Sequence, residues 1–270
     1  MEINRSNIMN IVNEFNLRPD KDYGQNFLVE PDVSKKIVDL LSIKNGEKVL
    51  EIGPGLGSLT HFLTQFDNEI DVVDIDHRMI EFIRYNYHEY KSLNCYENDI
   101  RKHNIGHYNK IIGNLPYNIT TELVNYLLIY GAECNRFVLM CQLEAINRFI
   151  DLSGKEYGPS SILVHLLGQP KKEFVVKHGC FYPVPKCASV VFTIDINSGL
   201  DRSLCIDVYK FSKLLFANRR KTIYNNLSNI IKDKEKAKDI LDKCGIDCSK
   251  RPEEIHYSKY VDLFKAYKNL

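Results

Sequence analysis

Apolar residues follow a repeating strand-and-helix pattern from about residue 31 to residue 151. Short runs rich in Val and Ile alternate with segments whose apolar residues recur at helical spacing. This alternation is typical of βα units, which build a mostly parallel sheet covered by helices. We therefore expect an α/β fold of the Rossmann-like kind, with strands at residues 48–52, 70–74, 93–97, 110–113 and 137–141.

Two further strand-like runs, at residues 174–176 and 189–196, flank a Pro-rich turn. They would suit antiparallel strands added at the end of the sheet. Near the N-terminus, residues 6–17 carry Ile8, Ile11 and Phe15 at helical spacing. This spacing predicts a helix that packs on the same domain.

The pattern changes after Asn197-Ser198-Gly199. The remaining chain lacks Gly-bounded strands and predicts helices at residues 205–217, 221–231, 234–244 and 252–267. We place a domain boundary near residue 198. An α/β domain over residues 1–197 would precede a small all-helical domain over residues 198–270.

The composition is that of an ordinary globular chain, since 44% of the 270 residues are hydrophobic and 26% are charged. The apolar run at residues 162–167 falls far short of the roughly 20 residues that a membrane span needs. The N-terminus lacks the apolar stretch of a secretory signal. We expect a cytoplasmic protein with no membrane contact, and we interpret His165 as a core residue of an apolar strand.

The eight cysteines form no close CxxC pairs. Together with the missing leader, this indicates free, reduced thiols. Cys244 and Cys248 have no matching His or Cys pair, so we predict no metal site.

Charge is distributed unevenly along the chain. Residues 1–130 carry 13 Lys and Arg against 19 Asp and Glu, whereas residues 131–270 carry 23 against 16. A protein that grips a polyanion concentrates positive charge on one face. Lys-rich helices can equally be solvated surfaces, so charge alone leaves nucleic-acid binding open.

A glycine-rich loop follows the first predicted strand. Glu51 ends this strand, and Gly53, Gly55 and Gly57 follow at alternate positions before a helix that begins near Ser58. Glycines at this spacing let the backbone approach a ligand that a Cβ atom would push away. The G-x-G-x-G spacing differs from the G-x-G-x-x-G of dinucleotide sites. It favours S-adenosylmethionine over NAD.

Acidic residues stand at three successive strand ends. Asp74 and Asp76 follow the second strand, about 20 residues beyond the glycines, where a carboxylate can accept hydrogen bonds from ribose hydroxyls. Asp99 follows the third strand and could accept from the exocyclic amine of an adenine. A single acid of this kind is more often a turn or helix cap. Three beside one glycine loop favour a nucleoside site that also includes Glu51.

The fourth strand leads into Asn114-Leu115-Pro116-Tyr117. An exocyclic amine is a poor nucleophile because its lone pair is conjugated with the ring. Two acceptors facing its N–H bonds can draw it toward tetrahedral geometry: the Asn114 side-chain carbonyl and the Leu115 backbone carbonyl, held in place by Pro116. Tyr117 can stack on the base. The sequence therefore predicts transfer of a methyl group to an amine without a metal.

The segment GNLPYNITTEL and five other separated motifs resemble the KsgA-type ribosomal RNA adenine dimethyltransferases, in the family order and over nearly the whole chain. The five are residues 23–28 (YGQNFL), the loop from Glu51 to Gly57, Asn98-Asp99, residues 181–186 (FYPVPK), and residues 216–222 (FANRRKT) with Asn225-Asn226-Leu227. The resemblance implies dimethylation of N6 of adenines in small-subunit (16S) ribosomal RNA. It also implies S-adenosylmethionine as the cofactor.

The resemblance also assigns roles to single residues. Contacts to the cofactor would come from Gln25, Asn26, Leu28, Gly53, Asp74 and Asp99, with Asn114 touching both the cofactor and the target amine. Tyr117 and Phe181 would sandwich the adenine. The base must be flipped out, since N6 is paired and edge-on within a helix.

The segment Arg219-Arg220-Lys221 opens the basic helical domain. In the family resemblance these side chains pair with RNA phosphates, and residues 198–270 form the RNA-recognition domain beside the catalytic domain at residues 1–197. The segment also argues against the Erm-type enzymes of large-subunit RNA. We expect a monomer that acts on ribosomal RNA within a pre-assembled small subunit.

Several positions depart from the family pattern. Asp74 stands where the family has Glu, and residues 140–144, 157–161 and 185–189 lose a Lys, a Leu and an acid respectively. These changes leave the cofactor chemistry intact. The alternatives are Erm-like methylation of large-subunit RNA, a non-catalytic ribosome assembly factor and methylation of a small molecule. Retention of Asn114, Pro116 and the glycines argues against a non-catalytic role.

Overall fold

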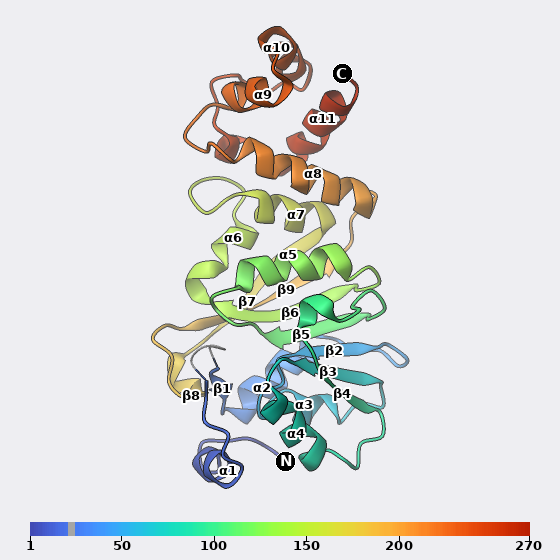
Figure 1. The fold of residues 1–270 in the computed structure, drawn as a ribbon, viewed down its shortest axis with the longest axis vertical. Helices are drawn as coiled ribbons and strands as arrows, with labels where there is room; N and C mark the ends of the chain where they lie inside the picture. The colour runs from blue at the N-terminus through green and yellow to red at the C-terminus, as the bar shows by residue number, and fades with distance from the viewer. Residues whose placement is uncertain (21–24) are drawn as a thin grey trace. The chain divides into compact units, whose positions relative to one another are not determined.

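The computed structural model describes residues 1–20 and 25–270 (Figure 1). It divides into two compact units. The first contains residues 1–146 and 171–195, and the second contains residues 147–170 and 196–270.

A seven-stranded sheet with the order β4-β3-β2-β5-β6-β9-β7 forms the centre of the first unit. The strands β2 to β6 are parallel, and β9 runs antiparallel to β6. This confirms the predicted parallel sheet and the antiparallel addition at its end. The bounds are β2 (Val49–Ile52), β3 (Ile70–Asp74), β4 (Leu93–Glu97), β5 (Lys110–Asn114), β6 (Arg136–Gln142), β7 (Gly168–Val176) and β9 (Ser189–Ile196).

Helices and a second, two-stranded sheet surround these strands. The small sheet pairs β1 (Phe27–Leu28) with β8 (Phe181–Tyr182) in antiparallel fashion. The helices of the first unit are α1 (Ile8–Glu14), α2 (Pro31–Asp39), α3 (Thr60–Leu63), α4 (His77–Asn86) and α5 (Thr120–Tyr130), with the 3-10 turns η1 (Ile100–Lys102), η2 (Leu143–Ala145) and η3 (His178–Cys180). The helix predicted at residues 6–17 is present as α1.

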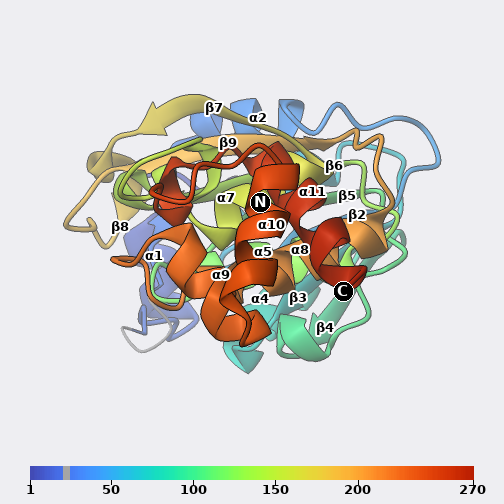
Figure 2. The same cartoon turned by 90° about the horizontal axis from the view of Figure 1, so that it is seen from above.

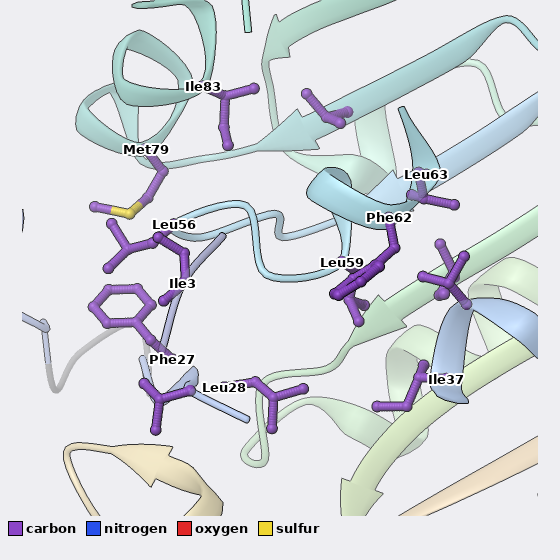
Figure 3. Packing of buried hydrophobic residues seen from close by; sticks show 14 of the residues in the cluster. Ile3, Phe27, Leu28, Ile37, Leu56, Leu59, Phe62, Leu63, Met79 and Ile83 are labelled. Atoms are coloured by element: carbon purple, nitrogen blue, oxygen red, sulfur yellow. The ribbon is translucent and has the colours of Figure 1, made fainter. Parts of the chain in front are cut away.

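One hydrophobic cluster holds the glycine loop between β2 and α3. Figure 3 shows Phe27 of β1 near Leu56 of the loop, with Leu28 of β1 below them and Met79 and Ile83 of α4 above them in this view. All of these side chains are buried. Close packing of this kind leaves few alternative positions for the backbone that it supports. Packing against the core therefore holds the loop in place.

The second unit is helical in its C-terminal part, as predicted. Its elements are α6 (Asn147–Ile150), α7 (Pro159–Leu167), α8 (Arg202–Leu215), α9 (Ile223–Ile231), α10 (Lys234–Lys243), η4 (Pro252–Glu254) and α11 (Tyr257–Lys268). Figure 2 shows α9 and α10, which pack against each other. The last predicted helix is divided: a 3-10 turn precedes α11, with Ile255 and His256 between them.

Residues 147–170 differ from the sequence analysis in two ways. They group with the C-terminal helices, whereas the predicted boundary near residue 198 assigned them to the α/β domain. The apolar run at residues 162–167 is helix α7 and not a strand. A short continuous apolar run has no period that separates a buried helix from a buried strand, which explains the error. Pro159 at the start of α7 was the available signal.

His165 keeps a structural role on this helix. Its ring stacks on Tyr257 with centroids 5.2 Å apart, and its Nε2 lies 3.2 Å from the carbonyl oxygen of Ile150. Burial lowers the pKa of the imidazole. The residue is a partnered neutral side chain and not a solvent-facing base.

The eight cysteines are all free thiols, which confirms the prediction. Over residues 1–20 and 25–270, no helix combines the length and apolarity that a membrane span requires.

Candidate active site

A cavity of about 210 Å³ lies at the carboxyl ends of the parallel strands in the first unit. Its walls come from the segment before β1, the glycine loop after β2, the ends of β3 and β4, and the loop after β5. In an open α/β sheet this edge is where ligands bind. The sheet thus brings together residues that are far apart in the sequence.

The glycine loop contributes two of its three glycines to the cavity wall. Gly53 and Gly55 line it, and Gly53 has a φ of +66°, which an L-residue rarely adopts. Gly57 instead faces the core, where an added Cβ would lie 3.0 Å from the Cδ1 atom of Ile83. Gly57 therefore packs against the core and does not line the cavity, and its predicted contact with the cofactor stays a prediction.

Glu51 lies under the loop rather than in the cavity wall. Its side chain is 1% exposed and accepts a hydrogen bond of 2.6 Å from the Thr60 hydroxyl. Burial, with the nearby Asp74 carboxylate, raises the pKa of Glu51 to about 8. The cavity wall includes the neighbouring Ile52 of β2 but not Glu51, and the predicted contact of Glu51 with the cofactor stays a prediction. Glu51 supports the loop through Thr60 of α3.

Asp74 is the acid of the second strand that reaches the cavity. The backbone N–H of Asp76 donates to it at 2.9 Å, and burial raises its pKa to about 6. Asp76 turns away: it caps α4, pairs with Arg78 at 2.6 Å and accepts from the Gln25 amide at 2.8 Å. Of the two candidate acids, Asp74 lines the cavity and Asp76 does not, and ribose binding by Asp74 stays a prediction.

Asp99 begins the turn η1 and also lines the cavity. The guanidinium of Arg101 lies 2.7 Å from its Oδ2 atom. This ion pair lowers the pKa of Asp99, so the carboxylate stays ionised and accepts hydrogen bonds at neutral pH.

Asn114 is the last residue of β5, and the nitrogen and oxygen of its side-chain amide lie in different surroundings. Its Nδ2 atom donates to the carbonyl oxygen of Asn26 at 3.3 Å. Its Oδ1 atom is buried and has no hydrogen-bond partner in the described part of the chain. Buried acceptors are nearly always satisfied, so this oxygen marks a place where a ligand donates. Leu115 and Pro116 line the cavity beside it, and so do Gln25 and Asn26.

Three predicted residues do not reach the cavity. Leu28 pairs with Phe181 across the two-stranded sheet, and both are buried in the core. The hydroxyl of Tyr117 lies 2.8 Å from that of Ser189. The base sandwich by Tyr117 and Phe181 therefore stays a prediction. Tyr23 and Gly24 of the first motif lie outside the described residues.

Several side chains of the wall were not predicted from the sequence, and two of them, Ile75 and Arg101, bear on ligand binding. Ile75 lines the cavity although 52% of its surface is exposed, so it offers an apolar contact to a flat ligand. Arg101 lines it beside Asp99. The available signals were an apolar residue, Ile75, directly after the strand-end acid and a cation, Arg101, two residues after Asp99.

The predicted RNA contacts lie in the second unit and differ from one another. Arg219 donates to the carbonyl oxygens of Gly154 and Tyr157 at 2.7 and 3.1 Å and lies 3.6 Å from Glu253. Arg220 and Lys221 are exposed. Arg219 thus ties the loop before α7 to the segment after α8, whereas its two neighbours face solvent.

These features fit S-adenosylmethionine. The positive φ of Gly53 lets the backbone form a wall without a Cβ, Asp74 and Asp99 offer acceptors at two strand ends, and an open acceptor on Asn114 remains for a second ligand. An adenosine group needs this combination of apolar surface and a few placed polar atoms.

The comparison with known families agrees with this geometry. A family model for ribosomal RNA adenine dimethylase matches residues 14–269. The chain belongs to this family. Membership confirms the resemblance seen in the motifs, and the protein is an S-adenosylmethionine-dependent methyltransferase enzyme.

Curated relatives of the ribosomal RNA adenine dimethylase family cover almost the whole chain. One from Malacoplasma penetrans is 35% identical over 246 residues, covering 89% of each chain. Another from Geobacter sulfurreducens is 35% identical over 269 residues, covering 93% of this chain and 95% of its own. Both are named ribosomal RNA small subunit methyltransferase A.

Two solved structures of related enzymes share the fold. A dimethyladenosine transferase from Plasmodium falciparum superimposes with a TM-score of 0.76 at 25% identity, covering 90% of this chain and 98% of its own. The 23S rRNA methyltransferase ErmE has a TM-score of 0.70 at 20% identity, covering 90% and 100%. The second likeness concerns the fold alone.

The buried Glu51 predicts a pH dependence of stability. Its pKa of about 8 in the folded protein lies above the ordinary 4.5, so between these values the unfolded chain has released a proton that the folded protein keeps. The free energy of unfolding therefore falls as pH rises through this window. Glu51→Gln removes the effect. Urea unfolding at pH 5 to 8 should show the variant gaining stability relative to wild type as pH rises.

The exposed Glu89 provides the matched control. Glu89→Gln should follow the wild-type curve at each pH. If the curves of wild type and Glu51→Gln stay parallel from pH 5 to pH 8, the raised pKa of Glu51 is wrong.

Proposed function

We propose that this protein transfers methyl groups from S-adenosylmethionine to N6 of adenines in small-subunit ribosomal RNA, giving N6,N6-dimethyladenosine. The open Oδ1 atom of Asn114, buried at the edge of the cofactor cavity, carries the proposal. The names of the relatives from Malacoplasma penetrans and Geobacter sulfurreducens support the choice of RNA.

The cofactor supplies an electrophilic methyl group on a positively charged sulfur. Gly53 and Asn26 would lie against it, Asp74 would accept from the ribose hydroxyls, and Asp99 would accept from the adenine amine. Ile75 would cover the adenine face. Each of these residues lines the cavity.

The chain activates the target amine by accepting hydrogen bonds from its two N–H groups. One N–H donates to Asn114 Oδ1 and the other to the backbone carbonyl of Leu115, which Pro116 restrains. This pair of acceptors turns the nitrogen lone pair away from the ring and toward the methyl group. The nitrogen would then carry the methyl group and release one of its two protons to water, and S-adenosylhomocysteine would be the leaving product.

A second methyl group can follow. After the first transfer one N–H remains, and Asn114 Oδ1 can accept it while the new methyl occupies the other side of the nitrogen. The product is then dimethylated. Tyr117 and Phe181 would hold the flipped base, which requires Tyr117 to leave Ser189 and Phe181 to become accessible.

The second unit would recognise the RNA. Arg220 and Lys221 are exposed and can pair with phosphates, whereas Arg219 is committed to its own unit. We propose a monomer that acts in the cytoplasm on a pre-assembled small subunit, where the folded RNA presents its target adenines.

Transfer from labelled S-adenosylmethionine to unmethylated small subunits tests the proposed substrate. Free small-subunit RNA and large-subunit RNA are compared alongside, with nucleoside analysis of each product. We expect dimethyladenosine in the assembled small subunit. Labelling confined to large-subunit RNA would contradict the proposal.

Asn114→Ala tests the proposed chemistry. Loss of one placed hydrogen-bonding group at a reacting centre lowers the rate by about 10² to 10³. We expect at least that loss in methyl transfer, while calorimetry still detects S-adenosylhomocysteine binding. Asn10→Ala, on the exposed face of α1, should transfer normally. Full activity of Asn114→Ala would refute the assigned role.

Arg219 and its neighbours should respond differently to mutation. Arg220→Ala and Lys221→Ala should each lower the salt dependence of RNA affinity by about one unit of slope and leave the melting temperature unchanged. Arg219→Ala should lower the melting temperature, because two carbonyl groups lose their donor. RNA binding across a salt series, with thermal unfolding of each variant, separates these effects. An unchanged slope for both exposed residues would exclude them from the interface.

A further inference from the structure

One guanidinium contacts two carboxylates at the mouth of the cavity. Arg101 Nη2 lies 2.7 Å from Asp99 Oδ2, and Nε lies 3.1 Å from Oδ1. On the other side, Arg101 Nη1 lies 3.1 Å from Glu122 Oε1. Both Arg101 and Asp99 line the cavity. The guanidinium therefore stands between the candidate adenine contact and helix α5.

The backbone of the same turn is fixed as well. The N–H of Arg101 donates to Asp99 Oδ1 at 2.9 Å, and its carbonyl accepts from the Tyr126 hydroxyl at 2.9 Å. Tyr126 and Glu122 both belong to α5. This helix begins directly after the Asn114–Tyr117 loop, where the Thr120 hydroxyl donates to the carbonyl of Pro116 at 2.9 Å. Arg101 thus connects the turn after β4 to the helix that follows the catalytic loop.

We propose that Arg101 is a positioning residue that sets the specificity for the 6-amino group of the cofactor's adenine, by holding the Asp99 carboxylate in one orientation. Glu122 in turn holds Arg101. The inference rests on the proposed contact between Asp99 and the adenine amine. It adds the residue that makes this contact selective.

The selectivity follows from hydrogen-bond chemistry. An ionised carboxylate only accepts, so it attracts an amine at position 6 and repels a carbonyl oxygen there. Both effects depend on a carboxylate that cannot turn away. A guanidinium that contacts both oxygens of Asp99 prevents the carboxylate from rotating. A Lys ammonium would restrain it less, because it is a single point charge.

Calorimetry with two ligands tests the inference. S-adenosylhomocysteine carries the 6-amino group, and S-inosylhomocysteine carries a 6-oxo group instead. Wild type should prefer the first. Arg101→Ala should raise the Kd of S-adenosylhomocysteine about tenfold and leave that of the inosine analogue within about twofold, so that the preference falls about tenfold. Arg101→Lys should lie between, and Glu122→Gln should shift in the same direction by less.

Arg84→Ala is the matched control. Arg84 pairs with Glu81 and with the carbonyl of Cys95, and it does not line the cavity. Both Kd values should stay at wild-type levels in this variant. Melting temperatures of all variants show whether each one is folded, and Arg101→Lys keeps the test open if Arg101→Ala is not.

The outcomes separate the inference from the function that it builds on. If wild type shows no preference between the ligands, the adenine contact of Asp99 is wrong, and the role of Arg101 is wrong with it. If wild type shows the preference but Arg101→Ala and Arg101→Lys keep it, the role of Arg101 alone is overturned. If the Arg101 variants bind both ligands more weakly by the same factor, the role of Arg101 in specificity is also overturned, because a residue with only a structural role would affect both Kd values equally.

Discussion

The site depends on the hydrogen bond between the Asn114 amide and the carbonyl oxygen of Asn26. A backbone carbonyl can only accept, so the nitrogen of the amide must face it and the oxygen must point the other way. If the amide were reversed, two oxygens would face each other. One contact thus determines that an acceptor, and not a donor, is open at the cavity. An adenine amine needs such an acceptor.

The parallel sheet makes this contact possible. Residue 26 and residue 114 are far apart in the sequence, and they meet because β1 packs beside the glycine loop while β5 ends at the same edge as β2 and β3. Glu51 supports the glycine loop through its hydrogen bond with Thr60 of α3. Glu51 is buried behind the cavity and supports its wall, whereas Asp74 and Asp99 line the cavity. Depth along the strand decides this division: Glu51 pairs in register with Val72, two residues before Asp74, so Glu51 lies further inside the sheet than the acid that reaches the cavity.

Much of the fold could be predicted because its strands are short apolar runs that end in glycines and acids. The cavity residues Gly53, Asp74, Asp99 and Asn114 were predicted for the same reason: strand ends in a parallel sheet converge. Gln25 and Asn26 were predicted from the family resemblance alone. The sequence could not separate Glu51 from the other strand-end acids, because its role depends on burial and on a partner nine residues away. Arg219 looks like its exposed neighbours in the sequence, and only its contacts with Gly154 and Tyr157 distinguish it. Helix α7 was missed because an apolar run without polar residues has no visible period.

The orientation of Asn114 toward an adenine can be seen in a crystal structure with S-adenosylhomocysteine and adenosine monophosphate. We expect the Asn114 amide to keep its hydrogen bond to Asn26 and its Oδ1 atom to lie within hydrogen-bond distance of N6 of the added adenine. The 6-amino group of the cofactor's adenine would donate a hydrogen bond to the Asp99 carboxylate. An Asn114 oxygen that accepts a hydrogen bond from a protein group, or an adenine that binds with N6 away from Asn114, would show that Asn114 does not activate the target amine.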